Sequence, residues 1–330
     1  MVEQITTQVY RIEIPLPEMT LKSVNSYVIT GEDRNLIVDP GMGSTECMEA
    51  LRAGLQEIGI GLQRTDFFIT HFHIDHFGLA PLVVDDASTI YMHAAERAII
   101  ERITTGSLFP ELADASRMNG FPEGELQEAL SFFRPLDVHT WKRPSPFTLV
   151  HDGDILSIGE YRFTCILTPG HTRGHMCLYE PHKKILVSGD HLLNEITPVV
   201  SARFEGENPL KDYLASLQRI YLLDTDRVLP GHKDIFRNGK ERIRELNDHH
   251  QKRAREVLSI LERGMKHAYD VASEMTWDIE FDTWDSLPAI QKFFAIGEAI
   301  AHLEYLVDTG AIRKAMCGNT VVYVKNKTVQ

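Results

Sequence analysis

Short stretches in which apolar and polar residues alternate are the first regular feature of the chain. Residues 9–15 and 24–29 predict a pair of β-strands, and residues 161–167 place Tyr, Phe, Cys and Leu at every second position. Successive side chains on a strand point to opposite faces, so this spacing predicts strands with a buried face. Short continuous apolar runs predict further strands at residues 36–38, 67–69, 89–92, 176–179 and 185–187.

Between these strands lie longer segments whose apolar residues recur every three or four positions. Met48, Leu51, Leu55 and Ile58 follow this rule and would form one face of a helix. The same spacing predicts helices at residues 94–104, 124–133, 208–221 and 239–263. Strands interleaved with helices are typical of an α/β fold, which is the fold class that we expect.

The pattern divides the chain into a large and a small part. We expect a catalytic domain at residues 1–245, with a helical insertion at about 94–141 that is longer than a usual connection. Residues 246–330 would form a second, mostly helical domain. It is predicted to contain two helices followed by a hairpin around Cys317, Gly318 and Asn319, which is the order of a winged helix.

Composition and charge narrow the class of protein. The chain has 330 residues, of which 43% are hydrophobic and 25% charged, as in ordinary globular proteins. Its formal net charge of −13 argues against nucleic acid or an anionic membrane as a partner. The first residues lack the basic start and apolar core of a secretion signal, so we expect a cytoplasmic protein. The four cysteines form no CxxC pair and favour neither a thiolate site nor a disulfide scaffold.

The most informative stretch is Thr70-His71-Phe72-His73-Ile74-Asp75-His76, which follows the predicted strand at 67–69. In an extended loop alternate side chains share one side, so His71 and His73 can hold one cation together. Asp75 and His76 would lie where the chain turns into a helix that begins near Gly78, and would face a neighbouring position. Imidazole and carboxylate are suited to zinc and, less selectively, to iron or manganese.

Three later segments also place one His or Asp directly after a predicted strand. They are Pro169-Gly170-His171, Ser188-Gly189-Asp190 and Pro230-Gly231-His232. Strand ends converge on one edge of a sheet, so these side chains are expected to meet the first motif. His93, His175 and His191 also stand near such positions. His93 is expected to lie at a helix start near the pocket rather than to bind metal, and contacts behind the ligands or with substrate are expected for His175 and His191.

In this order, HxHxDH, GHT, GD and PGH resemble the ligand motifs of the metallo-beta-lactamase superfamily. The resemblance covers roughly residues 5–240 and implies an αββα sandwich. It also implies two metal ions, most simply Zn²⁺, with iron or manganese as alternatives. One ion would take His71, His73 and His171, the other Asp75, His76 and His232, and Asp190 would bridge them. Asp39 would stand behind the ligands and hold their loop, and His175 is a further candidate for such a role.

Such a centre predicts a hydrolase in which a hydroxide shared by the two ions attacks an ester, thioester or lactone carbonyl. Asp75, His175 and a water molecule are the candidates for proton transfer to the leaving group. Phosphodiester cleavage, as in ribonucleases of the superfamily, and a mononuclear iron persulfide dioxygenase remain alternatives. A true beta-lactamase is disfavoured because an Asp stands at position 190 and no secretion signal is present. A non-enzymatic metal-binding or DNA-binding regulator is the weakest alternative, since every ligand position is filled.

The expected partner is a small molecule. Apolar side chains would line its pocket, at Leu16, Met19 and Leu21 in an early loop and at Phe109, Met118 and Phe121 in the insertion. Residues 251–330 contain ten Lys or Arg and eleven Asp or Glu, so the winged-helix-like domain lacks the basic face of a DNA reader. We expect it to be structural or to form a homodimer.

Overall fold

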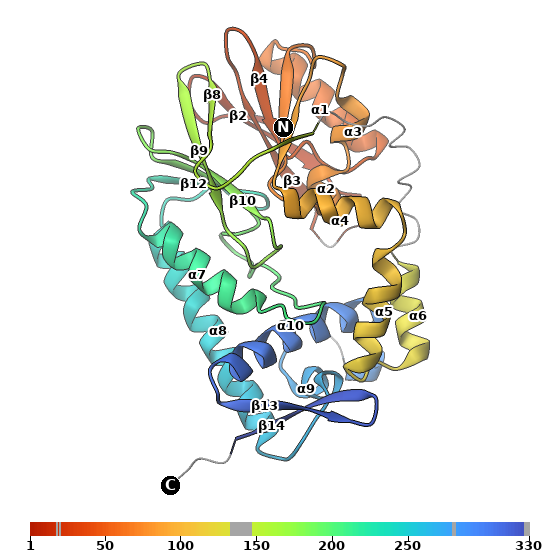
Figure 1. The fold of residues 1–330 in the computed structure, drawn as a ribbon. Coiled ribbons are helices and arrows are strands. Elements are labelled where there is room, and N and C mark those ends of the chain that lie inside the picture. The colour runs from red at the N-terminus through yellow and green to blue at the C-terminus, as the bar shows by residue number, and fades with distance from the viewer. Residues whose placement is uncertain (18, 20, 133–146, 279–281, 327–330) are drawn as a thin grey trace. The chain divides into compact units, whose positions relative to one another are not determined.

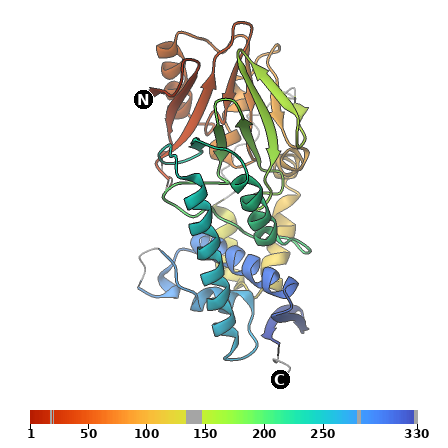
Figure 2. The same ribbon diagram turned by 90° about the vertical axis from the view of Figure 1, so that its left-hand side faces the viewer.

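The computed structural model describes residues 1–132, 147–278 and 282–326, apart from residues 18 and 20. Two compact units are present (Figures 1 and 2). The first contains residues 1–101, 139–198 and 216–243, and the second contains residues 102–138, 199–215 and 244–330. The predicted division into 1–245 and 246–330 stays a prediction. Most of the described part of the predicted insertion groups with the C-terminal residues, and residues 133–141 of it lie outside the described ones.

The first unit contains two mixed sheets. One has strands in chain order: β1 (Val2–Gln4), β2 (Val9–Pro15), β3 (Ser23–Ile29), β4 (Asn35–Val38), β5 (Thr65–Phe68), β6 (Ile90–Met92) and β7 (Phe147–Leu149). Its strands are antiparallel up to β4 and parallel from β4 to β7. The other has the order β12 (Arg227–Pro230), β11 (Ile185–Gly189), β10 (Met176–Glu180), β9 (Tyr161–Leu167) and β8 (Ile155–Ile158), with only β11 and β12 parallel.

The two sheets pack face to face through fully buried side chains. Tyr27 and Phe68 from the first sheet share one cluster with Phe163, Leu178 and Val187 from the second. Burial of such side chains contributes roughly 1.5–3 kcal/mol each relative to exposure. The alternation predicted for residues 161–167 is therefore confirmed, because its apolar positions form this interface.

Helices cover the other face of the first sheet. They are α1 (Thr45–Ile58), the short α2 (Ile74–Phe77) and α3 (Ala80–Val83), and α4 (Ala94–Thr104). Helix α1 starts where the Ser44 hydroxyl accepts a hydrogen bond from the Cys47 amide, and it ends at Gly59, whose φ of 85° favours glycine. Its face with Leu51 and Leu55 lies in one buried cluster with the sheet. Leu16 is buried in the same cluster and Met19 and Leu21 pack against it, so these side chains belong to the core.

The second unit is mainly helical. It contains α5 (Leu108–Met118), α6 (Glu123–Ser131), most of α8 (Gly239–Leu261), α9 (Ala268–Glu274), a 3₁₀ turn (Trp284–Ser286), α10 (Ala289–Asp308) and the hairpin β13 (Ile312–Cys317) to β14 (Thr320–Lys325). Both views show α10 crossing α8 (Figures 1 and 2). Helix α7 (Pro209–Tyr221) is divided between the units, and none of the described helices is long and apolar enough to cross a membrane.

Several local predictions need correction. The helix after the HxHxDH loop begins at Ile74, not near Gly78, so Asp75 and His76 are helical. The spacing predicted helices at residues 94–104 and 124–133 and none between them, but the structure has α5 there, and Pro110 falls in its first turn, where proline is tolerated. The helix predicted at residues 239–263 ends at Leu261, and Met265 is 55% exposed beyond its end. The helix–helix–hairpin order is present, while the winged-helix assignment stays a prediction.

Candidate metal centre

Asp39 connects the end of β4 with the loop that follows β5. Its φ of 52° lies in the left-handed region, which Asp and Asn enter more readily than most residues. Its Oδ1 accepts a hydrogen bond from the Thr70 amide at 2.8 Å, and its Oδ2 accepts from the Thr70 hydroxyl at 2.7 Å. The same Oδ2 lies 2.8 Å from Nδ1 of His76. Asp39 therefore fixes both the backbone of the motif and the orientation of one imidazole.

Three imidazoles converge beside this loop. Nε2 of His71 lies 2.9 Å from Nδ1 of His73, and Nε2 of His171 lies 3.2 Å and 3.0 Å from these two atoms. Three nitrogens bound tetrahedrally at about 2.0–2.1 Å from zinc would lie about 3.3 Å apart. The spacing of the three nitrogens is therefore close to that of a shared zinc ion.

A second group lies next to the first. Nε2 of His232 lies 3.3 Å from Nε2 of His76 and 3.3 Å from Oδ2 of Asp75. Nε2 of His76 lies 3.8 Å from the same carboxylate oxygen. These three residues form a second set able to hold a metal ion. Asp39, His71 and His76 also place possible ligand atoms within 4.8 Å of one another, but both oxygens of Asp39 already accept hydrogen bonds.

Asp190 lies against both groups. Its Oδ2 is 3.8 Å from Nε2 of His171 and 3.5 Å from Nε2 of His232, while its Oδ1 is 3.5 Å from Nε2 of His76. Among the described residues, this buried Oδ1 has no hydrogen-bond partner. Gly231 allows the carboxylate to come this close, because a Cβ there would lie 2.4 Å from Oδ1. A buried carboxylate oxygen without a donor needs a cation, and its position suits a bridge.

The outer nitrogens of three imidazoles are already engaged. Nδ1 of His232 donates to the Ser23 carbonyl at 2.7 Å, and Nδ1 of His76 donates to Asp39. The Thr70 hydroxyl gives its proton to Asp39, so it accepts from Nδ1 of His71 at 2.9 Å. Each of these rings therefore presents a lone pair at the inner Nε2, which is the tautomer that a metal ligand needs. The residues thus fit divalent ions of the zinc, iron or manganese type.

The electrostatics of the centre agree with this arrangement. Burial is the largest influence on the pKa of Asp75 and would raise it, but the facing His76 and His232 hold it at about 2. Burial likewise opposes ionisation of Asp190, yet His232 and His76 keep its pKa well below the usual range. Burial, with His171 nearby, lowers the pKa of His73 to about 3, so this ring is neutral at pH 7. Two ionised carboxylates therefore lie beside His76 and His232, whose pKa values they raise, while the His73 ring is neutral.

Glu96 is a buried residue of the site that sequence reasoning missed. Its Oε2 accepts a hydrogen bond from the Phe72 amide at 2.7 Å, and its Oε1 accepts from the Gly174 amide at 2.6 Å. It thus joins the loop of His71 and His73 to the loop that follows His171. Burial raises the pKa of Glu96 to about 7, against the effect of these two bonds. The signal in the sequence was an acidic residue on the buried face of α4, four positions before Ile100.

The remaining histidines near the site lie outside the two donor groups. Nδ1 of His175 lies 2.8 Å from the Thr168 hydroxyl, and its Nε2 accepts from the Asp190 amide at 3.2 Å. With both nitrogens engaged and the ring buried, His175 holds the Asp190 backbone and is poorly placed to donate a proton to substrate. His93 caps the start of α4, where its Nδ1 accepts from the Ala95 amide, and His191 is a buried neighbour of the His175 ring.

Comparisons with known proteins agree with this geometry. Residues 19–232 match the model of the metallo-beta-lactamase superfamily, and residues 254–325 match that of a metallo-beta-lactamase-like C-terminal domain. The chain is 27% identical over 271 residues to acyl-coenzyme A thioesterase MBLAC2 of Gallus gallus, covering 76% of this chain and 87% of the relative. It is 25% identical over 335 residues to a probable metallo-hydrolase of Bacillus subtilis, covering 96% and 98%.

A solved structure extends the likeness to both units. The metallo-beta-lactamase family protein from Thermus thermophilus superposes with a TM-score of 0.81 and 28% identity. The match covers 98% of this chain and 100% of that one. The αββα fold expected from the motifs is thus confirmed, and the chain is a metal-dependent hydrolase that belongs to the metallo-beta-lactamase superfamily.

Proposed function

We propose that this protein hydrolyses a small acyl thioester with the help of two divalent metal ions, zinc being the first candidate. The observation that carries the proposal is the pair of donor groups with one carboxylate between them. His71, His73 and His171 would hold one ion, and Asp75, His76 and His232 the other. Asp190 would bridge them, because it lies within 4 Å of donors from both groups.

When bound at these residues, two divalent ions would lower the pKa of a water molecule to give a nucleophile at neutral pH, and would polarise the carbonyl that is attacked. The chain's own residues fix the geometry for this chemistry. Asp39, Ser23 and Thr70 orient the imidazoles, while Glu96 and His175 hold the loops behind them. Asp75 is ionised at neutral pH, so it can accept a proton from water but does not enter the cycle as an acid.

A thioester is favoured over the other acyl substrates because the relative from Gallus gallus is named an acyl-coenzyme A thioesterase. Ester and lactone hydrolysis use the same attack on a carbonyl and remain within the proposed class. A nuclease would need Lys and Arg along the phosphates, whereas this chain has a net charge of −13. A persulfide dioxygenase would use a single iron, which leaves the second donor group without a role.

The test is a substrate panel with metal-loaded protein. We expect hydrolysis of short acyl-coenzyme A thioesters that depends weakly on salt, with little cleavage of single-stranded RNA. His71→Ala should abolish the activity, whereas His182→Ala, a change in an exposed turn, should leave it unchanged. Salt-sensitive RNA cleavage lost in His71→Ala, or oxygen consumption with a persulfide, together with no acyl turnover, would replace this proposal by the corresponding alternative.

The second unit is proposed to be structural or dimer-forming rather than DNA-binding. Its near balance of charges from residue 251 onward supports this, since a DNA reader needs a basic face. Light scattering of the full chain, with and without duplex DNA, tests it. A mass that rises with DNA at physiological salt would overturn the proposal.

A further inference from the structure

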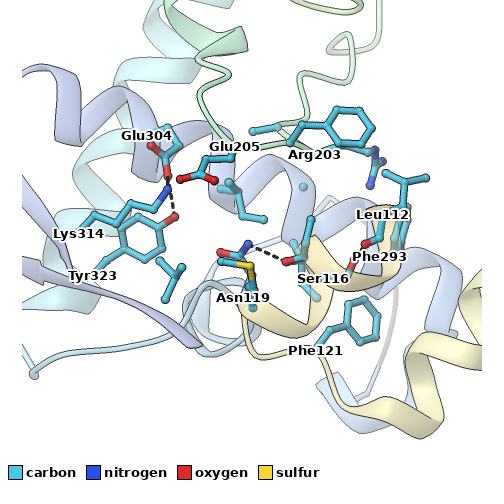
Figure 3. A pocket seen from close by; sticks show the side chains of 18 of the residues that line it. Leu112, Ser116, Asn119, Phe121, Arg203, Glu205, Phe293, Glu304, Lys314 and Tyr323 are labelled. Atoms are coloured by element: carbon cyan, nitrogen blue, oxygen red, sulfur yellow. Dashed lines mark hydrogen bonds and ion pairs between the residues drawn. The ribbon is translucent and has the colours of Figure 1, made fainter. Parts of the chain in front are cut away.

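A cavity of about 120 Å³ lies entirely within the second unit (Figure 3). Residues of α5, α10, the β13–β14 hairpin and the segment 202–205 line it. Most of the lining is apolar, including Leu112, Phe121, Phe293, Ile296, Ile300 and Val321. An apolar cavity of about 150 Å³ in another protein binds benzene, so this one has room for a body of about six carbon atoms.

Arg203 is the unusual residue of this lining. Its guanidinium carbon lies 4.3 Å from the centre of the Phe293 ring and 5.6 Å from that of Phe294. Among the described residues, the guanidinium has no hydrogen bond and no ion pair. Arg203 is partly exposed, and its buried surroundings lower its pKa to about 10, with Glu207 opposing the shift, so the group is charged at neutral pH. Stacking on an aromatic ring leaves the N–H donors at the guanidinium edge available to an anion.

The other charged groups of the lining are arranged differently. The Lys314 ammonium and the Tyr323 hydroxyl both bind the Glu304 carboxylate at 2.8 Å. Glu205 is exposed, and Figure 3 shows the guanidinium of Arg203 extending toward Leu112. Lys314 is thus neutralised, while Arg203 retains its charge beside the apolar surface.

Asn119 adds a second polar group to the wall. Its Nδ2 donates to the Ala115 carbonyl at 2.9 Å, but its buried Oδ1 has no hydrogen-bond partner among the described residues. A buried acceptor without a donor is destabilising. The lining therefore combines a cation that has no ion pair among the described residues with an apolar body, which is the composition of a site for a small anionic ligand. A carboxylate has no proton to donate to the Asn119 oxygen, so that oxygen would not contact it.

We propose that this cavity binds a small carboxylate with an apolar body of about five or six carbon atoms, and that Arg203 holds the carboxylate. The carboxylate would serve as the counter-ion of the guanidinium, and the apolar body would lie among Phe121, Ile296 and Val321. The site consists of second-unit residues only and does not depend on the reaction proposed for the metal centre.

The test is a titration of metal-loaded full-length protein with hexanoate, followed by ligand-observed NMR, with uncharged hexanamide as the matched compound. We expect saturable binding of one hexanoate, and at least about tenfold weaker binding of hexanamide, because a charge-assisted hydrogen bond is lost. Arg203→Met, which keeps the length but removes the charge, should weaken hexanoate binding by about ten- to a hundredfold. Arg255→Met, at an exposed position of α8, should bind as the wild type does.

Two further variants distinguish this cavity from the metal centre and guard against misfolding. Ala115→Leu fills the cavity without touching the charge and should also abolish binding, which keeps the proposal testable if Arg203→Met does not fold. His71→Ala should retain hexanoate binding, because the cavity is separate from the metal centre. If hexanoate were instead bound by the metal ions, this variant would lose the binding. Absence of saturable binding in the wild type, wild-type affinity in Arg203→Met or Ala115→Leu, or loss of binding in His71→Ala would each overturn the proposal.

Discussion

Replacing Asp39 by Asn tests how the protein prepares the metal ligands. The change keeps the size of the side chain, and Asn also tolerates the observed φ of 52°. The carboxylate of Asp39 accepts three hydrogen bonds, from the Thr70 amide, the Thr70 hydroxyl and His76. An amide cannot accept all three, because one of its two terminal atoms is a donor.

The two orientations of the introduced amide have different costs. If its NH₂ faces the Thr70 amide, two donors meet and one buried N–H stays unpaired. If its NH₂ faces His76, that ring must accept at Nδ1 and carry its proton on Nε2, the atom that lies 3.3 Å from Nε2 of His232. Either way the loss is about 1.5–3 kcal/mol, the value of a hydrogen bond to a charged group, or about ten- to a hundredfold in metal affinity.

The assay is competition between the protein and a chromophoric chelator for zinc at about pH 7.5, with Asp33→Asn as the matched control. Asp33 is fully exposed, with a side-chain relative accessibility of 104%, so the same chemical change there should leave affinity unchanged. A cooperative urea-unfolding transition of each metal-free variant shows that the variant is folded. Wild-type zinc affinity in a folded Asp39→Asn protein would refute the role given to Asp39.

Three other changes probe the support of the centre and the core of the second unit. Gly231→Ala should lower metal affinity by at least about tenfold in the chelator assay, because its Cβ would collide with Asp190, whereas Gly61→Ala, which meets no atom within 4 Å, should not. Glu96→Ala should leave the amides of Phe72 and Gly174 unpaired, which should lower the free energy of unfolding in urea by about 1–3 kcal/mol for each amide. A decrease of less than about 0.5 kcal/mol would contradict the role of Glu96 in joining the two loops. Burial lowers the pKa of His302 to about 4, so the unfolded chain, with a His pKa of about 6.5, binds its proton first as the pH falls. Stability should therefore drop between about pH 6.5 and 4, with this one group accounting for on the order of 1 kcal/mol at pH 5.5, and metal-free His302→Leu should lose that part of the pH dependence in urea unfolding.

The convergence of the candidate ligands could be predicted because each ligand motif directly follows a strand. His71 and His232 are far apart in the sequence, but each follows the end of a strand, β5 and β12 respectively. These two strands, from different sheets, end close together, where Asp39 and Asp190 also lie. Short-range pattern was enough here, since strand ends in such sheets converge.

The support behind the ligands could not be predicted in the same way. Glu96 accepts hydrogen bonds from the backbone amides of Phe72 and Gly174. Because every residue except proline has such an amide, the identity of these two residues does not predict an acidic partner. Helix α5 was missed because Pro110 and the neighbouring glycines suggested a break, although proline in a first turn leaves a helix intact. Arg203 gave no signal at all, because its lack of a counter-ion depends on which side chains the fold places around it.

The central claim is that two ions act together in one hydrolytic centre. It is tested most directly by adding zinc to metal-free protein in steps and measuring both bound zinc and acyl-coenzyme A hydrolysis after each step. We predict that binding ends at two ions per chain, and that activity continues to rise with the second. Full activity at one ion per chain, or a centre that never holds more than one, would contradict the account.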